Sequence, residues 1–318
     1  MTHHLKGVLI ILVLGIAGIL AARFILPQFQ DQLQRSTSDA AGVKGQIRIG
    51  MDNWIGYFPL CSAEMSRRMR AQGYALNCED DQADYAERYR RLAKGELQFA
   101  VGTVDSYLLN GVASDFPGAL IAVLDESKGG DAIVARRDAL ANLSALQGRT
   151  DLKIAYTANS PSEQLLKSIN EHFDLQLYGP NRAWQLPSEG SSDALDRLLK
   201  GQAQVAVLWE PDVSRALAEP GIGKLIGTED TDRLIVDVLL VERRFSREQP
   251  ELVELLLRTY FDSLRQYLSQ PEQLLAEVRE KTGLGAEQVE LMLRGVRWSN
   301  LNDNGLNWFG LAPALQQE

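Results

Sequence analysis

Two polar segments follow directly on predicted strands and carry side chains that could hold a small molecule. The first, Asp52–Tyr57, combines an amide, an indole and a phenol in a glycine-containing loop. Aromatic rings at the end of a strand form walls of ligand clefts. The same rings would also serve as an apolar cover for the next helix, so both interpretations stay open.

The second segment, Ser160–Glu163, has the pattern of a helix N-terminus, with proline at the first helical position. It follows at once on the predicted strand Leu152–Thr157. A helix start directs backbone N–H groups and a positive dipole end outward, which suits an anion. A simple helix cap is the alternative.

The sequence contains few residues that could form a catalytic centre. The three histidines are His3, His4 and His172, of which two precede an apolar segment and one lies mid-helix. No phosphate loop, dinucleotide-binding loop or Cys/His metal spacing is found. A carboxylate pair, Asp105 with Glu210, could still act as acid and base in a degenerate hydrolase. We expect no enzyme activity, no cofactor and no metal.

Strand-like and helix-like patterns alternate from residue 46 onward, which is typical of βαβ units. We therefore expect an α/β fold with mainly parallel central sheets. In such sheets, ligands bind beyond the carboxyl ends of the strands. The two polar segments stand where a site is expected.

An internal repeat indicates two similar lobes. Residues 91–101 read RLAKGELQFAV and residues 197–207 read RLLKGQAQVAV, with seven of eleven positions identical. The predicted strands that begin at Ile47 and Leu152 match at nearly the same offset. By this repeat, Gly102–Asp105 corresponds to Leu208–Pro211. A chance match of one helix–glycine–strand fragment is the alternative.

Two further segments, 119–136 and 234–245, are placed to cross between the lobes, and two crossings describe a hinge. The amphipathic helices at 251–268 and 271–282 are assigned to lobe I. The expected divisions are an N-terminal transmembrane segment (1–27), a polar tether (28–45), the first part of lobe I (46–128), lobe II (129–233), and the return strand with the C-terminal helices of lobe I (234–318).

The N-terminal segment contains a run of sixteen uncharged residues, 7–22, between Lys6 and Arg23. About twenty apolar residues cross a bilayer, so we expect an uncleaved single-pass anchor with the body in the periplasm. A cleaved signal peptide is the rival, although small residues do not occupy both positions before a cut. A buried soluble helix is the third interpretation.

Composition and charge limit the classes of partner that the chain could bind. The chain has 42 acidic and 33 basic residues, a net charge of −9, which excludes a sequence-independent nucleic-acid binder. The first forty residues sum to +1, so the rest carries −10. The only cysteines, Cys61 and Cys78, fall at the same edge of one βαβ unit, where a disulfide is reasonable in an oxidising compartment. Two free buried thiols are the alternative.

From about Ile47 to Leu257 the chain resembles the solute-binding proteins of the nitrate, sulfonate and taurine ABC-importer group. The resemblance rests on the loop Trp54–Tyr57, residues 92–111 and 129–148, and the motifs Trp209–Pro211 and Arg243–Pro250. It implies a type II, two-lobed periplasmic binder that closes at a hinge and delivers a small solute to a permease. The positions that match ligand contacts of the group are Asn53, Trp54, Tyr57, Thr103, Asp105, Thr157, Ser160, Ser162, Trp209 and Glu210.

The sequence departs from this group in two respects, since it has an apparent uncleaved anchor and its segment 299–310 falls outside the matched region. The nominated loops also contain no Arg or Lys for an anion, with only Lys128 near the hinge. A sulfonate- or nitrate-like solute, an uncharged or partly cationic solute, and anion capture by backbone N–H groups all stay open.

We therefore expect a membrane-tethered solute-binding protein of an ABC importer, with a small molecule and an inner-membrane permease or other membrane protein as partners. A ligand sensor or scaffold of the cell envelope with the same fold is the alternative, and the Asp105/Glu210 hydrolase is a second one.

Overall fold

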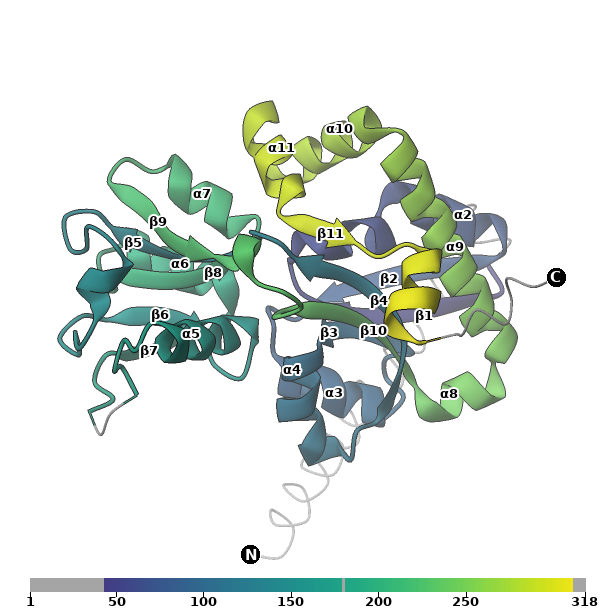
Figure 1. Cartoon of the computed structure of the whole chain (residues 1–318). Helices are drawn as coiled ribbons and strands as arrows, with labels where there is room; N and C mark the ends of the chain where they lie inside the picture. The colour runs from purple at the N-terminus through teal and green to yellow at the C-terminus, as the bar shows by residue number, and fades with distance from the viewer. Residues whose placement is uncertain (1–42, 179–180, 311–318) are drawn as a thin grey trace, which may run out of the picture.

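A computed structural model describes residues 43–178 and 181–310, which form two α/β units side by side (Figure 1). The predicted anchor (1–27) lies outside the described residues, and so does the predicted tether apart from its last three residues. Within the described part of the chain, no helix is long and apolar enough to cross a membrane.

The first unit is built on a six-stranded sheet with the order β11–β4–β10–β3–β1–β2. Strand β1 is parallel to β2 and β3, while β10 is antiparallel to β3 and β4, and β11 is antiparallel to β4. The strands are β1 (Gly45–Met51), β2 (Tyr74–Asp80), β3 (Phe99–Thr103), β4 (Gly118–Ser127), β10 (Val236–Glu242) and β11 (Val296–Trp298).

The second unit is built on a five-stranded sheet with the order β7–β6–β8–β5–β9. Strand β6 is parallel to β7 and β8, and β5 is antiparallel to β8 and β9. The strands are β5 (Asp131–Arg136), β6 (Ile154–Thr157), β7 (Gln185–Ser188), β8 (Val205–Trp209) and β9 (Ile222–Gly227).

Both sheets are mixed, and the prediction of mainly parallel sheets is wrong in this respect. The βαβ units that the alternation indicated supply only the parallel trios β2–β1–β3 and β7–β6–β8. Strands β5 and β10 arrive from the other unit, so they enter at the edge where the parallel strands end. A strand that enters there must run in the opposite direction.

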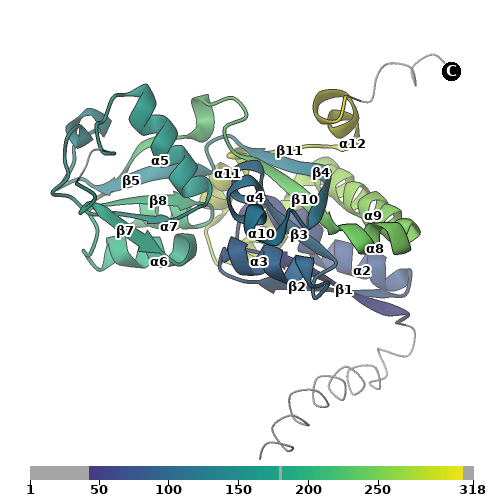
Figure 2. The ribbon, with the colours of Figure 1, turned by 90° about the horizontal axis from the view of Figure 1, so that it is seen from below.

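Helices cover both faces of each sheet. In the second unit, α5 packs on one face and α6 with α7 on the other (Figure 2). In the first unit, α9 packs against α2 (Figure 1). The helices are α2 (Ala63–Ala71), α3 (Tyr85–Ala93), α4 (Val104–Asn110), α5 (Pro161–His172), α6 (Gly190–Leu199), α7 (Asp212–Ala218), α8 (Arg243–Glu248), α9 (Pro250–Ser269), α10 (Pro271–Thr282), α11 (Ala286–Arg294) and α12 (Leu301–Asp303), with short turns η2 (Ile55–Cys61), η3 (Gly111–Ser114), η4 (Leu143–Leu146), η5 (Thr228–Asp230) and η6 (Asn304–Trp308).

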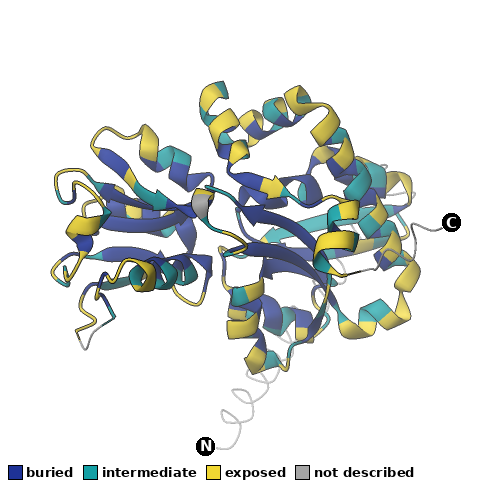
Figure 3. Ribbon diagram, viewed as in Figure 1, coloured by how far each residue is buried: buried dark blue, intermediate teal, exposed yellow. Residues whose placement is uncertain are grey.

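Period-2 alternation explains why the second sheet has a core on each side. Ile133, Val205 and Val207 face one core, whereas Ala132 and Leu208 face the other. Figure 3 shows the central strands of both units as buried ribbon between partly exposed helices, whereas the edge strand β2 is half-buried. The sheets therefore act as rigid platforms, and their ends carry the loops.

The internal repeat has a physical cause at the ends of α3 and α6. Gly95 and Gly201 both take the left-handed conformation, with φ of 69° and 71°. In each case the glycine N–H and the next N–H bond back to the last turn, which is a Schellman cap. Gln98 then accepts a hydrogen bond from the backbone of β1, and Gln204 accepts one from Lys153 N just before β6, each at 2.9 Å. The repeated Gly and Gln thus fix how each helix returns to its sheet.

The chain passes between the units twice, at residues 128–130 and 228–235, and one side chain joins the two passages. The hydroxyl of Thr228 accepts a hydrogen bond from Gly129 N at 2.8 Å and contacts the Ser127 hydroxyl at 2.7 Å. The carbonyl of Gly295 accepts hydrogen bonds from Lys128 N and Gly130 N. The C-terminal part of the chain therefore braces the crossing.

The segment after α11, which sequence patterns could not place, completes the first sheet. Strand β11 pairs with β4, and the Trp298 indole donates to the carbonyl of Gly56 at 2.8 Å. Farther along, the Asn304 amide accepts from Val123 N and donates to Val123 O. A side chain thus continues the ladder along the edge of β4.

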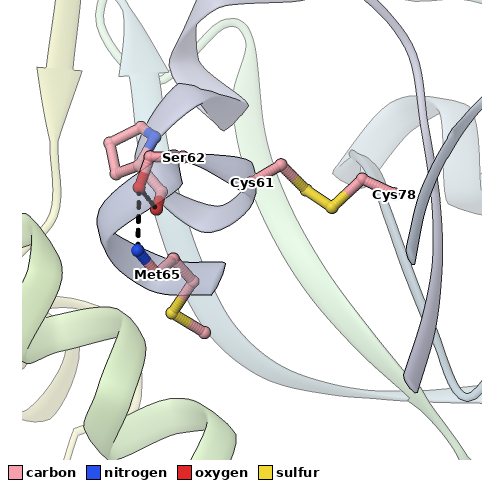
Figure 4. The surroundings of a disulfide bond; sticks show 5 residues. Cys61, Ser62, Met65 and Cys78 are labelled. Atoms are coloured by element: carbon pink, nitrogen blue, oxygen red, sulfur yellow. Dashed lines mark hydrogen bonds between the residues drawn. A yellow bond between two sulfur atoms is a disulfide. The ribbon is translucent and has the colours of Figure 1, made fainter. Parts of the chain in front are cut away.

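Cys61 and Cys78 form a disulfide, which confirms that prediction (Figure 4). The bond joins the end of η2 to β2 across a separation of 17 residues, with 6.2 Å between the Cα atoms. Beside it, Ser62 caps α2 by accepting from Met65 N at 3.1 Å.

We expect the double variant Cys61→Ser/Cys78→Ser to lose about 3 kcal/mol of unfolding free energy, because a closed loop of this length restricts the unfolded chain. Urea denaturation with and without reductant measures this loss. The reductant should leave the double variant unchanged, and a wild-type midpoint that is insensitive to reductant would contradict the prediction.

Candidate functional site

A small cavity lies where the two units meet, at the carboxyl ends of β1, β3 and β8. Its volume is about 10 Å³, which is room for about one water molecule. The two units are therefore drawn together in this structure. The lining residues are Asp52, Trp54, Tyr57, Tyr85, Thr103, Ile235 and Asp237 from the first unit with the return crossing, and Asp131, Pro161 and Trp209 from the second.

A larger opening of about 430 Å³ also lies between the units. Trp209 lines both spaces, so one indole stands at both the cavity and the opening. The lining residues of the opening are Asn53, Asp80, Gln82, Glu189, Gly190, Ser191, Ser192, Asp193, Asp196 and Trp209.

Asn53 connects the two units directly. Its amide oxygen accepts from the Trp209 indole at 2.8 Å, and its amide nitrogen donates to the Ser192 hydroxyl at 3.2 Å. The neighbouring Ile55 N donates to the carbonyl of Glu210 at 3.2 Å. These contacts hold the first loop of one unit against the second unit.

Asp52 is neutralised within the first unit. Its carboxylate accepts from the guanidinium of Arg88 at 3.0 Å and from the Tyr85 hydroxyl at 3.3 Å. Arg88 is fully buried and also binds Asp81 and the carbonyl of Val101. One buried guanidinium therefore serves two carboxylates on one side of the cavity.

Asp125 and Asp237 stand opposite each other on neighbouring strands β4 and β10. The Trp54 indole donates to Asp125 at 3.0 Å, and the Tyr57 hydroxyl donates to Asp237 at 2.5 Å. In both residues the second carboxyl oxygen is buried without a hydrogen-bond partner. No ion pair within the described residues involves either carboxyl.

Burial is the main cause of the raised pKa values of these carboxyl groups. Removal from water raises the pKa of Asp125 to about 7, and the pKa of Asp237 is also raised, first by burial and then by the charge of Asp125. Burial likewise raises the pKa of Asp131, at the start of β5, to about 8. Three carboxyl groups with raised pKa thus lie at the crossing between the units, at the end of β4, the start of β5 and the start of β10.

Solved structures of the same architecture are known. The alkanesulfonate-binding protein SsuA from Xanthomonas axonopodis pv. citri, bound to MOPS, matches with a TM-score of 0.67 and 16% identity, covering 81% of this chain and 88% of that chain. The chain has the periplasmic-binding-protein fold. No protein-family model and no curated protein sequence matches it.

Two further solved structures have this fold. The periplasmic aliphatic sulphonate-binding protein SsuA from Escherichia coli matches with a TM-score of 0.60 and 18% identity, covering 80% of this chain and 86% of that chain. The periplasmic nitrate-binding protein NrtA from Synechocystis PCC 6803 matches with a TM-score of 0.58 and 13% identity, covering 76% of this chain and 68% of that chain. At these identities, the likeness shows the fold that our sequence comparison implied.

The structure brings four of the ten predicted ligand contacts to the cavity, namely Trp54, Tyr57, Thr103 and Trp209. Asn53 lines the larger opening. Both spaces lie between the units. Their role in binding a ligand is a proposal that we take up below.

The predicted positions at the start of α5 make hydrogen bonds to nearby backbone. The Ser160 hydroxyl donates to the carbonyl of Thr157 at 2.7 Å and accepts from Ser162 N at 3.1 Å. Ser162 donates to the carbonyl of Val207, and Glu163 accepts from Asn159 N. These serines cap the helix and join it to β8, whereas the buried Thr157 hydroxyl has no partner.

Asp105 and Glu210 do not share the cavity, since neither is among its lining residues. Both oxygens of Glu210 accept from Ser214, at 2.9 Å and 2.8 Å, although burial raises its pKa to about 7. Asp105 is half-buried at the start of α4, with one oxygen unpartnered. The geometry gives no support to an acid–base pair made of these two residues.

Three lining residues with polar groups, Tyr85, Asp131 and Asp237, lie outside the segments that the sequence nominated, and Asp52 stands in the nominated segment Asp52–Tyr57 but not among the ten predicted contacts. A usable signal was present for Asp237 and for Asp125, its partner on the neighbouring strand. Asp237 interrupts the apolar run of β10, and Asp125 interrupts that of β4. A carboxylate inside a buried strand needs a partner or a function, so it marks a candidate site.

Proposed function

We propose that the protein is a solute-binding protein that captures a small molecule in the space between its two units. The units correspond in this proposal to the predicted lobes, with boundaries near residues 129 and 234. The N-terminal segment tethers the body to the inner membrane, and the body delivers its solute in the periplasm to an ABC permease.

One observation carries this proposal. Polar and aromatic side chains from both units converge at strand ends on one small cavity, and within residues 43–178 and 181–310 the chain crosses between the units twice. Ligands bind at such edges in open α/β sheets, and hinge closure around a ligand is the motion that a double crossing allows. The named functions of the structures with this fold agree with it.

The test is a thermal-shift screen of the full chain in detergent against anionic, neutral and cationic small molecules. A true solute at a hundredfold excess over its Kd should raise the unfolding free energy by about 2.7 kcal/mol. If no compound of any charge moves the transition, solute binding loses its support.

Trp209→Phe should reduce affinity for any such solute by tenfold or more, because it removes an indole that lines the cavity and the donor to Asn53. Trp184→Phe is the matched control, since Trp184 is buried in the core of the second unit and donates to the carbonyl of Leu177. Isothermal titration should show the loss in the first variant alone. Equal affinities in both variants would show that Trp209 does not contribute to solute binding.

A further inference from the structure

The space between the units is lined by carboxyl groups, some of which are paired with basic side chains outside the lining. Three carboxyl groups, those of Asp52, Asp131 and Asp237, line the small cavity, and no basic side chain does so. The larger opening adds four more carboxylates and again no basic side chain, its acidic members being Asp80, Glu189, Asp193 and Asp196.

The basic residues nearest this space have other partners. Arg88 is held by Asp52 and Asp81. Lys128, the only lysine that sequence reasoning placed near the hinge, pairs with Glu126 at 3.3 Å and donates to the carbonyl of Thr231. A sulfonate or nitrate in the cavity would therefore face carboxyl groups without a free counter-charge.

The cavity also offers acceptors that lack donors. Asp237 is 2% exposed and lines the cavity, and its Oδ2 has no hydrogen-bond partner. The Oδ2 of Asp125, on the neighbouring strand, is in the same state. A buried acceptor without a donor is costly, and an ionised carboxylate can only accept. Burial holds protons on these carboxyl groups in the unliganded protein. A group that binds them in the ionised form must therefore be a hydrogen-bond donor, and a cation would best replace the released protons.

Provided that the protein binds a solute as proposed above, we infer that this solute is a small organic cation whose ammonium or guanidinium group is held by Asp131 and Asp237. Trp209 lines both the cavity and the larger opening, so the body of the solute extends past its ring toward the acidic opening. A bare metal ion fits less well, because no group of three or more His, Cys, Asp or Glu among the described residues is arranged to hold one.

The decisive experiment compares ligands that share a carbon chain and differ in charge. Isothermal titration of the full chain in detergent would use butane-1,4-diamine, butane-1,4-diol and butane-1,4-disulfonate, together with agmatine, ethanolamine, taurine and isethionate. We expect binding of at least one compound with a net positive charge, and at least tenfold weaker binding of the neutral and anionic partners.

The outcomes separate the two proposals. Binding of a sulfonate or of a neutral compound, lost in Trp209→Phe, would overturn the cationic class and leave solute binding intact. Absence of a thermal shift with every compound of the wider screen would overturn solute binding itself. Binding that persists in Trp209→Phe and in the variants below would place the cation outside the cavity, which also overturns the inference.

Isosteric variants test the assigned carboxyl groups. Asp237→Asn and Asp131→Asn should each weaken cation binding at least tenfold while leaving the melting temperature of the unliganded protein equal or higher. A purely structural carboxyl group would show the reverse, a lower melting temperature with unchanged affinity. Asp138→Asn, which alters an exposed carboxylate paired with Arg136, is the matched control and should change neither quantity.

Discussion

Replacement of Arg88 by methionine is expected to lower the unfolding free energy by about 3–5 kcal/mol, the cost of breaking a buried ion pair by removing one partner. The guanidinium is 0% exposed and contacts Asp52 at 3.0 Å, Asp81 at 2.5 Å and the carbonyl of Val101 at 2.8 Å. It also lies 4.6 Å from the centre of the Tyr85 ring. Methionine fills much of the volume but leaves two carboxylates and a carbonyl without their donor.

Arg90→Met provides the control on the same helix. Arg90 pairs with Glu87 on the exposed face of α3, and exposed pairs contribute little to stability. Chemical denaturation of both variants at one pH measures the difference. If Arg88→Met were no less stable than Arg90→Met, Asp52 and Asp81 would have to be ionised and hydrated without Arg88, and our account of the cavity wall would be wrong.

The sequence indicates where the strands lie but not the direction in which all of them run. Alternating patterns and the Gly95/Gly201 repeat indicate the parallel βαβ trios because helix length, capping glycine and strand length are local properties. The direction of β5 and β10 is not local. It depends on where the chain re-enters a sheet after a crossing, and an isolated strand has the same period-2 pattern in either direction.

The same distinction applies to the candidate site. Trp54, Thr103 and Trp209 are predictable because the strand-end rule needs only the end of each strand. Asp131 and Asp237 were missed because their importance comes from convergence: each begins or interrupts a strand of a different sheet, and only the crossing brings them together. At Ser160 and Ser162, a pattern that would also suit an anion caps the helix and joins it to β8.

The unliganded protein is expected to lose stability as the pH rises from about 5 to about 8.5, and Asp131 should be a principal cause. Burial raises the folded-state pKa of Asp131 to about 8, with further increases from the charges of Asp105, Asp125 and Asp52 and a partial offset by Ser127. The unfolded value is about 3.9. The folded protein therefore holds a proton that the unfolded chain has released throughout this window.

The sign of the effect follows from this difference in bound protons. Below pH 4 both states are protonated and the contribution of Asp131 is fully present, whereas it is lost as the pH rises through the folded-state pKa near 8. Each unit of pKa difference is worth about 1.4 kcal/mol, so the loss is on the order of a few kcal/mol. Asp125, with a pKa of about 7, contributes in the same direction at slightly lower pH.

Urea denaturation of wild type and Asp131→Asn at pH 5, 6, 7 and 8 measures this contribution as a difference, which removes the titration of all other groups. The stability of wild type relative to Asp131→Asn should fall across the series, while Asp138→Asn should track wild type. A difference that stays constant with pH would mean that Asp131 is ionised in the folded state. That result would also require a cation beside it, which the described residues do not supply.

The same titration connects stability to binding. A cationic ligand binds the ionised carboxyl groups, so it must release the protons that burial retains, and its affinity should rise between pH 6 and pH 8 in the window set by the raised pKa values of Asp125 and Asp131. Saturation with the ligand should then flatten the decline of wild-type stability with pH. An affinity that falls over this range would indicate a ligand that prefers the protonated groups, as an anion would, and this cavity would then select the opposite charge.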